Sequence, residues 1–322
     1  MRQFAKPTIV VSKCLEFDAC RYNGEMIPDV TIRNLQPFVT FIPVCPEVEI
    51  GLGTPRETIR IVEENGENRL VQPSTREDVT EKMEQFSNDF LQTISDVDGF
   101  ILKNRSPSCG TRDVKIYSGF EKAPAKGKGS GLFGGAVVKK FSHLPIEEEG
   151  RLSNFIIREH FFTRLFTIAY YKMIKHNKNI KALVSFQSDN KYLFMAYNQV
   201  KQKELGRIIA NQKNEKIEVV FENYEKTLYE LFMRTPRYTS NVNVCEHIFG
   251  YFKTKLKKQE KDHFIELLQK YAEKKIPLSS LLTILKSWAI RFDEKYLLRQ
   301  TYFEPYPEAL VEISDSGKGR DY

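Results

Sequence analysis

Three cysteines in the first half of the chain each stand at the end of a short apolar run that has the composition of a buried β-strand. Cys14 follows TIVVS (8–12), Cys45 ends FVTFIPV (38–44), and Cys109 follows GFILK (99–103) after a short Ser/Pro turn. In an open parallel sheet, ligands bind beyond the carboxyl ends of the strands. The three thiols are therefore predicted to converge on one site, although they lie far apart in the sequence.

Three thiolates are compatible with two kinds of metal centre. They could bind zinc with one open position, or a 4Fe–4S cluster in which one iron has no protein ligand. A third alternative is that they are small buried core residues, as free cysteines often are. The five cysteines of the chain are odd in number and scattered. They do not resemble a disulfide framework, which favours a reducing compartment.

The elements that would position these thiols are typical of an α/β domain. A further apolar run is GGAVVKK (134–140), and helices are expected over 29–36, 74–94 and, near the same run, 131–141. Ser74 and Glu77 have the spacing of a capping box, and residues 123–131 are rich in Lys and Gly, as in a flexible loop. Strands that alternate with helices predict a parallel, Rossmann-like three-layer α/β sheet.

The pattern changes to long helical periodicity near residue 152. We therefore expect two domains, 1–152 and 153–322, with the second an all-α bundle. Its predicted helices, several of them bounded by prolines, are 153–175, 180–198, 201–211, 217–233, 244–274, 278–289 and 294–302.

The basic charge lies in the second half alone. Residues 151–322 contain 30 Lys and Arg against 20 Asp and Glu, whereas residues 1–150 contain 19 against 22. Such an asymmetry favours a polyanionic partner, although a solvated Lys-rich helical surface would give the same count. A basic patch is expected at Lys253, Lys255, Lys257 and Lys258, beside Tyr251 and Phe252. No apolar stretch approaches ~20 residues, and the N-terminus does not resemble a signal peptide, so no membrane partner and a cytoplasmic location are expected.

Four blocks in the first half resemble the thiouracil and thiouridine desulfidase family, and they occur in the family order. They are VSKCLEFDACRYNG (11–24), FIPVCPEVEIGLGTPR (41–56), LKNRSPSCG (102–110) and PIEEEGRL (145–152). The resemblance implies a 4Fe–4S cluster held by Cys14, Cys45 and Cys109, whose open iron takes the sulfur of the substrate as a soft Lewis acid. Cys20 does not match the ligand set.

The resemblance also implies roles for polar residues. It favours Glu49 as the base that activates water and Ser106 as a hydrogen-bonding or proton-passing partner. Glu47 is a second carboxylate in the same segment and is expected to contact substrate or to make a structural hydrogen bond. Arg56 or Arg105 could hold a phosphate or the nucleobase carbonyl.

The second half resembles the YbgA-type helical domain that is often fused to this desulfidase domain. The matching blocks are LGRIIA (205–210), CEHIFGYFKTKL (245–256), YAEKKIPL (271–278) and YFEPYP (302–307). The resemblance implies desulfuration of 4-thiouridine in tRNA. One departure is FQSDNKYLFMAY (186–197), where Gln187, Asn190 and Tyr197 replace the histidines that are typical of the family.

Three alternatives stay open on the sequence. The first is the same chemistry on free 2-thiouracil. The second is a non-catalytic, metal-stabilised module that binds RNA or senses redox state, and the third is a zinc hydrolase.

Overall fold

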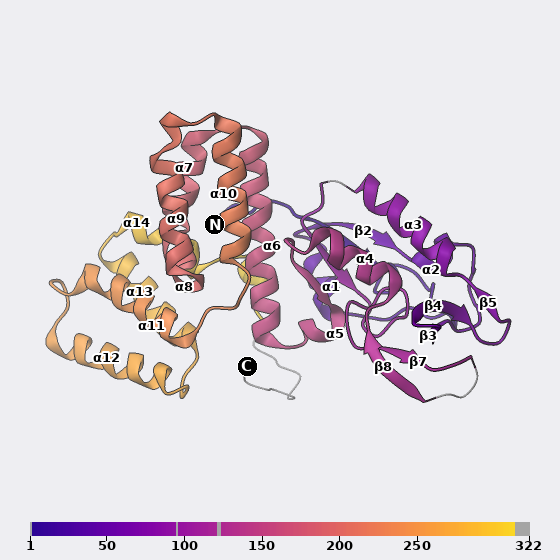
Figure 1. The fold of residues 1–322 in the computed structure, drawn as a ribbon. Helices are drawn as coiled ribbons and strands as arrows, with labels where there is room; N and C mark the ends of the chain where they lie inside the picture. The colour runs from indigo at the N-terminus through magenta and orange to yellow at the C-terminus, as the bar shows by residue number, and fades with distance from the viewer. Residues whose placement is uncertain (1, 95, 121–123, 313–322) are drawn as a thin grey trace. The chain divides into compact units, whose positions relative to one another are not determined.

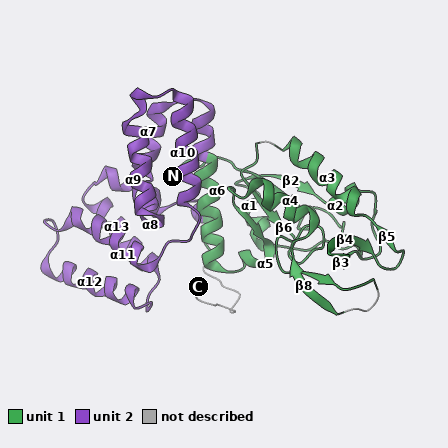
Figure 2. Cartoon of the chain, in the orientation of Figure 1, with its two compact units in different colours: residues 1–169, 309–322 green, residues 170–308 purple. Residues whose placement is uncertain are grey.

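The structure is a computed structural model that describes residues 2–94, 96–120 and 124–312. It divides into two compact units, which are residues 1–169 with 309–322, and residues 170–308 (Figure 2). The domain boundary expected after residue 152 lies at the end of helix α5 (Glu149–Leu152), which precedes the observed division after residue 169. The next helix, α6 (Phe155–His176), contributes residues to both units.

A four-stranded parallel sheet forms the centre of the first unit, which confirms the predicted α/β class (Figure 1). Its strands are β1 (Thr8–Ser12), β2 (Thr40–Val44), β6 (Gly99–Leu102) and β9 (Ile146–Glu148), in the order β2-β1-β6-β9. Strand β1 pairs with β2 and β6 on its two sides. Four of the five β1 residues and all of β6 are buried, as expected for strands that are covered on both faces.

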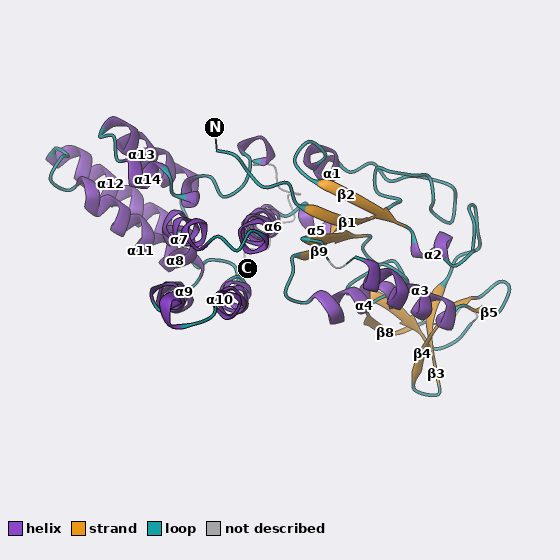
Figure 3. Ribbon diagram, turned by 90° about the horizontal axis from the view of Figure 1, so that it is seen from above, coloured by secondary structure: helices purple, strands orange, loops and turns teal. Residues whose placement is uncertain are grey.

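Helices cover both faces of this sheet, with α1 (Val30–Leu35) on one side and α3 (Thr80–Thr93) and α4 (Leu132–Phe141) on the other (Figure 3). The Asp29 side chain caps α1 by accepting a hydrogen bond from the backbone N–H of Ile32 at 2.9 Å. The strand predicted over 134–140 is wrong and the helix expected over 131–141 is confirmed, because this run belongs to α4. Phe133, Val137 and Phe141 recur every four residues and are all buried, which is a helical period.

A second sheet of five strands was not predicted. It consists of β3 (Arg60–Glu64), β4 (Glu67–Gln72), β5 (Glu77–Asp78), β7 (Val114–Tyr117) and β8 (Ala125–Gly129). Asn65 and Gly66 have φ angles of 53° and 85°, as a two-residue hairpin turn requires, and they join β3 to β4. The helix expected from residue 74 begins only at Thr80, because residues 77 and 78 form strand β5. The segment expected to be a loop contains β8, and its residue 123 lies outside the described residues.

The second unit is helical, as predicted. Its helices are α7 (Ile180–Asp189), α8 (Lys191–Tyr197), α9 (Gln199–Ala210), α10 (Ile217–Leu231), α11 (Tyr238–Phe249), α12 (Lys258–Ala272), α13 (Leu278–Arg291) and α14 (Lys295–Leu298). Two predicted helices are each divided. Asn190 separates α7 from α8, where its side chain donates to the Phe186 carbonyl at 2.8 Å. The 3₁₀ turn Gly250–Phe252 separates α11 from α12. No helix in the described part of the chain is long and apolar enough to cross a membrane.

Candidate active site

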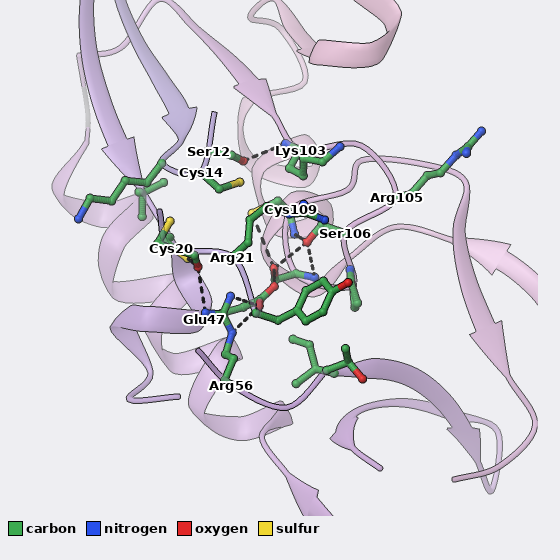
Figure 4. Close-up of a pocket in the computed structure, with 18 of the residues that line it drawn as sticks. Ser12, Cys14, Cys20, Arg21, Glu47, Arg56, Lys103, Arg105, Ser106 and Cys109 are labelled. Atoms are coloured by element: carbon green, nitrogen blue, oxygen red, sulfur yellow. Dashed lines mark hydrogen bonds and ion pairs between the residues drawn. The ribbon is translucent and has the colours of Figure 1, made fainter. Parts of the chain in front are cut away.

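The carboxyl ends of β1, β2 and β6 border a cavity of about 390 Å³ in the first unit. Cys14 follows β1 by two residues, Cys45 follows β2 directly, and Cys109 lies in the turn after β6. All three thiols line the cavity, and Cys20 lines it as well (Figure 4). The structure thus brings together the three cysteines that the sequence predicts to converge, and adds a fourth.

The turn that carries Cys109 is held rigidly from two sides. The Ser106 hydroxyl accepts a hydrogen bond from the backbone N–H of Cys109 at 3.1 Å. On the other side, the start of α4 packs directly against the turn. A Cβ at Gly134 would stand 2.4 Å from the carbonyl oxygens of Cys109 and Gly110, so only glycine fits there. This close approach fixes the position of the Cys109 sulfur.

Burial makes the Cys14 and Cys109 thiols hard to ionise on their own. It raises the pKa of Cys14 to about 12, and the neighbouring Cys45 sulfur adds to the effect. Burial likewise raises the pKa of Cys109 well above its usual range, against a hydrogen bond from Ser12 that lowers it. A bound metal reverses this preference, because a coordinating thiol loses its proton. Cys14 and Cys109 are therefore expected to lose their protons only when a metal binds them.

The thiols are not arranged around a single ion. Within the described residues, no group of three or more His, Cys, Asp or Glu side chains is placed to hold one metal ion. A zinc ion needs its sulfur ligands at about 2.3 Å from one point. In a 4Fe–4S cluster each thiolate binds a different iron, so the sulfurs stand further apart.

Glu47 is the carboxylate on the cavity wall. Its Oε1 accepts a hydrogen bond from the Ser108 hydroxyl at 2.6 Å, and its Oε2 accepts from Arg56 Nε at 2.9 Å and from Arg56 Nη2. The Ser108 oxygen also lies 2.9 Å from the Ser106 oxygen and 3.7 Å from the Cys109 sulfur. Hydrogen bonds therefore connect Arg56 to Glu47, Glu47 to Ser108, and Ser108 to the Cys109 sulfur.

Arg56 compensates the charge of Glu47 in a place that water barely reaches. The Arg56 side chain is 4% exposed and the Glu47 side chain 13%. Arg56 Nη1 also donates to the carbonyl oxygens of Cys20 and Gly53, both at 2.9 Å. These contacts satisfy the guanidinium and tie the loop that carries Cys20 to the segment after β2.

Glu49 lies elsewhere, although the sequence analysis assigns the base to it. Its side chain is exposed and is not among the residues that line the cavity. The reason is that residues 46–49 form the helical turn α2 (Pro46–Glu49), in which side chains two positions apart point to opposite sides. Only Glu47 of the two faces the thiols.

Of the other predicted residues, Ser106 and Arg56 line the cavity, and Arg105 lies at its rim. Arg105 has a positive φ of 55°, and its side chain points away from the cysteines (Figure 4). Ser108, Tyr22 and Lys103 also line the cavity and were not predicted from the sequence. The signal for Ser108 was its place beside Cys109 in SPSCG.

The three polar residues that replace the family's histidines have internal contacts in the second unit. Gln187 accepts a hydrogen bond from the Tyr224 hydroxyl at 2.6 Å. The Asn190 side chain caps the end of α7, and the Tyr197 ring packs on Phe232 with centroids 4.7 Å apart. Each position therefore stabilises the helical core.

The basic patch expected near residue 253 has little exposed aromatic surface beside its lysines. Phe252 is completely buried, so it belongs to the core. Tyr251 is 38% exposed and stacks on Tyr296 with centroids 6.2 Å apart. Lys255 forms an ion pair with Glu294, which reduces the positive charge of the patch.

Comparison with known proteins assigns both halves of the chain. Residues 9–149 match the family described as 2-thiouracil desulfurase. A 118-residue stretch is 36% identical to the uncharacterized protein YbbK of Bacillus subtilis, and covers 34% of this chain and 77% of YbbK. The chain belongs to the 2-thiouracil desulfurase family. Membership in this family supports an enzyme.

The helical half has its own relatives. Residues 191–307 match a family described as a protein of unknown function, DUF1722. The uncharacterized protein YbgA of Escherichia coli is 23% identical over 148 residues, which cover 46% of this chain and 87% of YbgA. The chain therefore has a desulfurase-like domain followed by a YbgA-like domain. A solved structure titled [4Fe-4S]-dependent thiouracil desulfidase TudS is 25% identical and covers 46% of this chain and 93% of its own, with a TM-score of 0.37, too low to carry weight.

Proposed function

We propose that this protein is a 4Fe–4S-dependent desulfidase that converts 4-thiouridine in tRNA to uridine and releases sulfide, without net electron transfer. The observation that carries the proposal is the joint presence of Cys14, Cys45, Cys109 and the buried carboxylate Glu47 at one cavity, in a member of the desulfurase family. Thiols at the ends of three strands and a carboxylate within reach supply the two kinds of group that this chemistry needs.

The donor set fits the cluster. Cys14, Cys45 and Cys109 would hold it, because they are soft ligands that line one cavity. When bound, the cluster supplies a thiophilic Lewis acid that polarises the C=S bond. The hydroxyl of Ser12 and the turn around Cys109 are placed to hydrogen-bond to the sulfur ligands.

Glu47 is proposed as the base in place of Glu49. The reaction adds the oxygen of water to the carbon that carries sulfur, breaks the C–S bond, and yields the carbonyl compound and hydrogen sulfide. Glu47 would take a proton from the attacking water while its hydrogen bonds to Arg56 hold the carboxylate in place. The departing sulfur would receive the proton that Glu47 takes from water, and Ser108 and Ser106 extend the hydrogen-bonded network from Glu47 toward the Cys109 turn.

The charge of the helical unit supports tRNA as the partner. Residues 170–308 contain 25 Lys and Arg against 16 Asp and Glu, a net charge of +9. Such an excess favours binding to the phosphate backbone of a nucleic acid. The description of the matching family favours a second candidate, the same chemistry on free 2-thiouracil.

The first experiment is anaerobic cluster reconstitution with iron and sulfide analysis, followed by incubation with thiolated tRNA and with 2-thiouracil. Sulfide release and loss of the 4-thiouridine absorption band support the main proposal. Turnover of 2-thiouracil alone supports the second candidate, and failure to bind iron under strictly anaerobic conditions contradicts both. Glu47→Gln and Glu49→Gln are then compared at equal cluster content. A larger loss in Glu49→Gln returns the role of base to Glu49.

A further inference from the structure

Positive side chains gather on the first unit beside the rim of the cavity. Arg105 belongs both to the rim and to this group. The carboxylate of Asp113 lies among Lys128, Arg105 and Arg112, whose charges lower its pKa, Lys128 most strongly through a hydrogen bond. Lys128 Nζ stands 3.1 Å from Asp113 Oδ1. Three cations thus surround one carboxylate, and the local charge stays positive.

A fourth cation adds to this group at a cost in stability. Strands β7 and β8 are antiparallel, and their register places Lys115 directly opposite Lys128, both exposed. Like charges that face each other across a ladder destabilise a hairpin. Asp113 already pairs with Lys128 and offsets part of the repulsion, and an anion bound between the two ammonium groups would offset the rest.

The local backbone presents these side chains outward. The buried carboxylate of Glu148 accepts hydrogen bonds from the backbone N–H groups of Thr111 and Arg112 at 2.7 and 3.2 Å. This anchors the chain at Arg112 and leaves its guanidinium exposed. Arg105 and Asp113 have φ angles of 55° and 56°, so tight turns fix both positions.

Protection of a sheet edge is a simpler explanation for part of this group. Strand β8 is the edge of the five-stranded sheet, and lysines on edge strands prevent edge-to-edge pairing. That role accounts for Lys128. It does not account for Arg105 and Arg112, which lie outside the strands, or for the place of Arg105 at the cavity.

We propose that Arg105, Arg112, Lys115 and Lys128 form a phosphate-binding patch that recognises the thiolated base as part of a nucleotide chain. The base enters the cavity, and a phosphate adjoining its ribose lies on the patch, where guanidinium groups can bind it in bidentate fashion. The inference rests on the proposed function, because a free base carries no phosphate for the patch to bind. The residues that distinguish RNA from a free base would then lie in the first unit, which contains the cavity.

The test compares 4-thiouridine with 4-thiouridine 3′,5′-bisphosphate on the intact, cluster-loaded chain, with kcat/KM as one readout. Calorimetric binding of the unreactive uridine 3′,5′-bisphosphate is the second. Two phosphate contacts at an exposed site are expected to favour the bisphosphate about tenfold at low salt, and 0.5 M NaCl is expected to remove most of this preference. Arg112→Gln/Lys128→Gln is expected to bring the ratio near one. Lys139→Gln, an exposed lysine of α4, is the control and keeps the ratio.

Lys115→Gln separates recognition from simple structural support. It removes the like-charge pair, so we expect a higher urea midpoint together with weaker binding of the bisphosphate. A ratio that is the same in wild type and Arg112→Gln/Lys128→Gln overturns the patch, as does equal affinity for inorganic phosphate and the bisphosphate. If neither substrate loses sulfur, the proposed function fails. The affinity for uridine 3′,5′-bisphosphate, compared by calorimetry between wild type and Arg112→Gln/Lys128→Gln, then still decides the patch.

Discussion

Arg56→Met tests whether the buried ion pair with Glu47 sustains the site. The substitution keeps much of the side-chain volume but leaves a carboxylate that is 13% exposed without its partner. Removing one partner of a buried pair costs about 3–5 kcal/mol. The carbonyl oxygens of Cys20 and Gly53 also lose their donor. For a unit of this size the midpoint of thermal unfolding is expected to fall by roughly 10 °C.

The assay should distinguish the two units, because a single transition is not guaranteed in a two-unit chain. Trp288 is the only tryptophan of the sequence and lies in the helical unit, so its fluorescence reports that unit. Hydrogen exchange at β1 and β6 reports the first unit. We expect the substitution to lower protection at β1 and β6 and to leave the fluorescence transition in place.

A double variant decides the physical cause. Glu47→Gln/Arg56→Met removes both charges, so no uncompensated carboxylate is left and the loss of stability should be about 2 kcal/mol smaller than in Arg56→Met. Equal losses in the single and double variants would refute the ion-pair argument. They would show instead that Arg56 acts through its hydrogen bonds to the backbone.

Three further predictions concern the ligands, the turn and pH. Cys14→Ser is expected to lose most of its iron after anaerobic reconstitution, and Cys245→Ala, in the core of the helical unit, to keep it; equal iron in both would contradict the ligand assignment. Gly134→Ala is expected to displace the Cys109 turn and lower iron content, whereas Gly127→Ala meets open space and should not. Burial, together with the charge of Arg164, lowers the pKa of His160 to about 3. As the pH falls below about 6.5, the histidine therefore takes up a proton in the unfolded chain but not in the folded chain. Stability should drop by about 2 kcal/mol between pH 7 and pH 5, a loss seen as a lower urea midpoint that His160→Gln should reduce.

The sequence predicted the parallel sheet and the convergence of its cysteines because both follow from local signals. Apolar runs identify buried strands, and strand ends meet at one edge of a parallel sheet. The hairpin β3–β4 was missed although Asn65-Gly66 is a strong turn signal, because its strands are short and only partly apolar. The run around Val137 was assigned both to a strand, on its composition, and to a helix over 131–141, and its period of four indicates the helix.

The details of the site depended on contacts that no local pattern contains. Two carboxylates two residues apart could not be told apart without knowing that α2 is a helical turn. The approach of Cys20 to the cavity depends on Arg56, which is 36 residues away in the sequence and holds the Cys20 carbonyl. The grouping of Arg105 with Lys128 depends on how β8 pairs with β7.

The three strand-end cysteines also set the order of assembly of the site. Cys14 and Cys109 are 95 residues apart and meet only after β1 has paired with β6, whereas Cys45 joins them through the pairing of β1 with β2. Such pairings have high contact order and form slowly. During synthesis, the first two thiols emerge from the ribosome well before the third, so a cluster cannot be captured until the sheet has closed. Metal binding would then be a late step that stabilises the completed sheet by mass action. Chains in which the sheet is incomplete would not gain this stability and would stay susceptible to degradation.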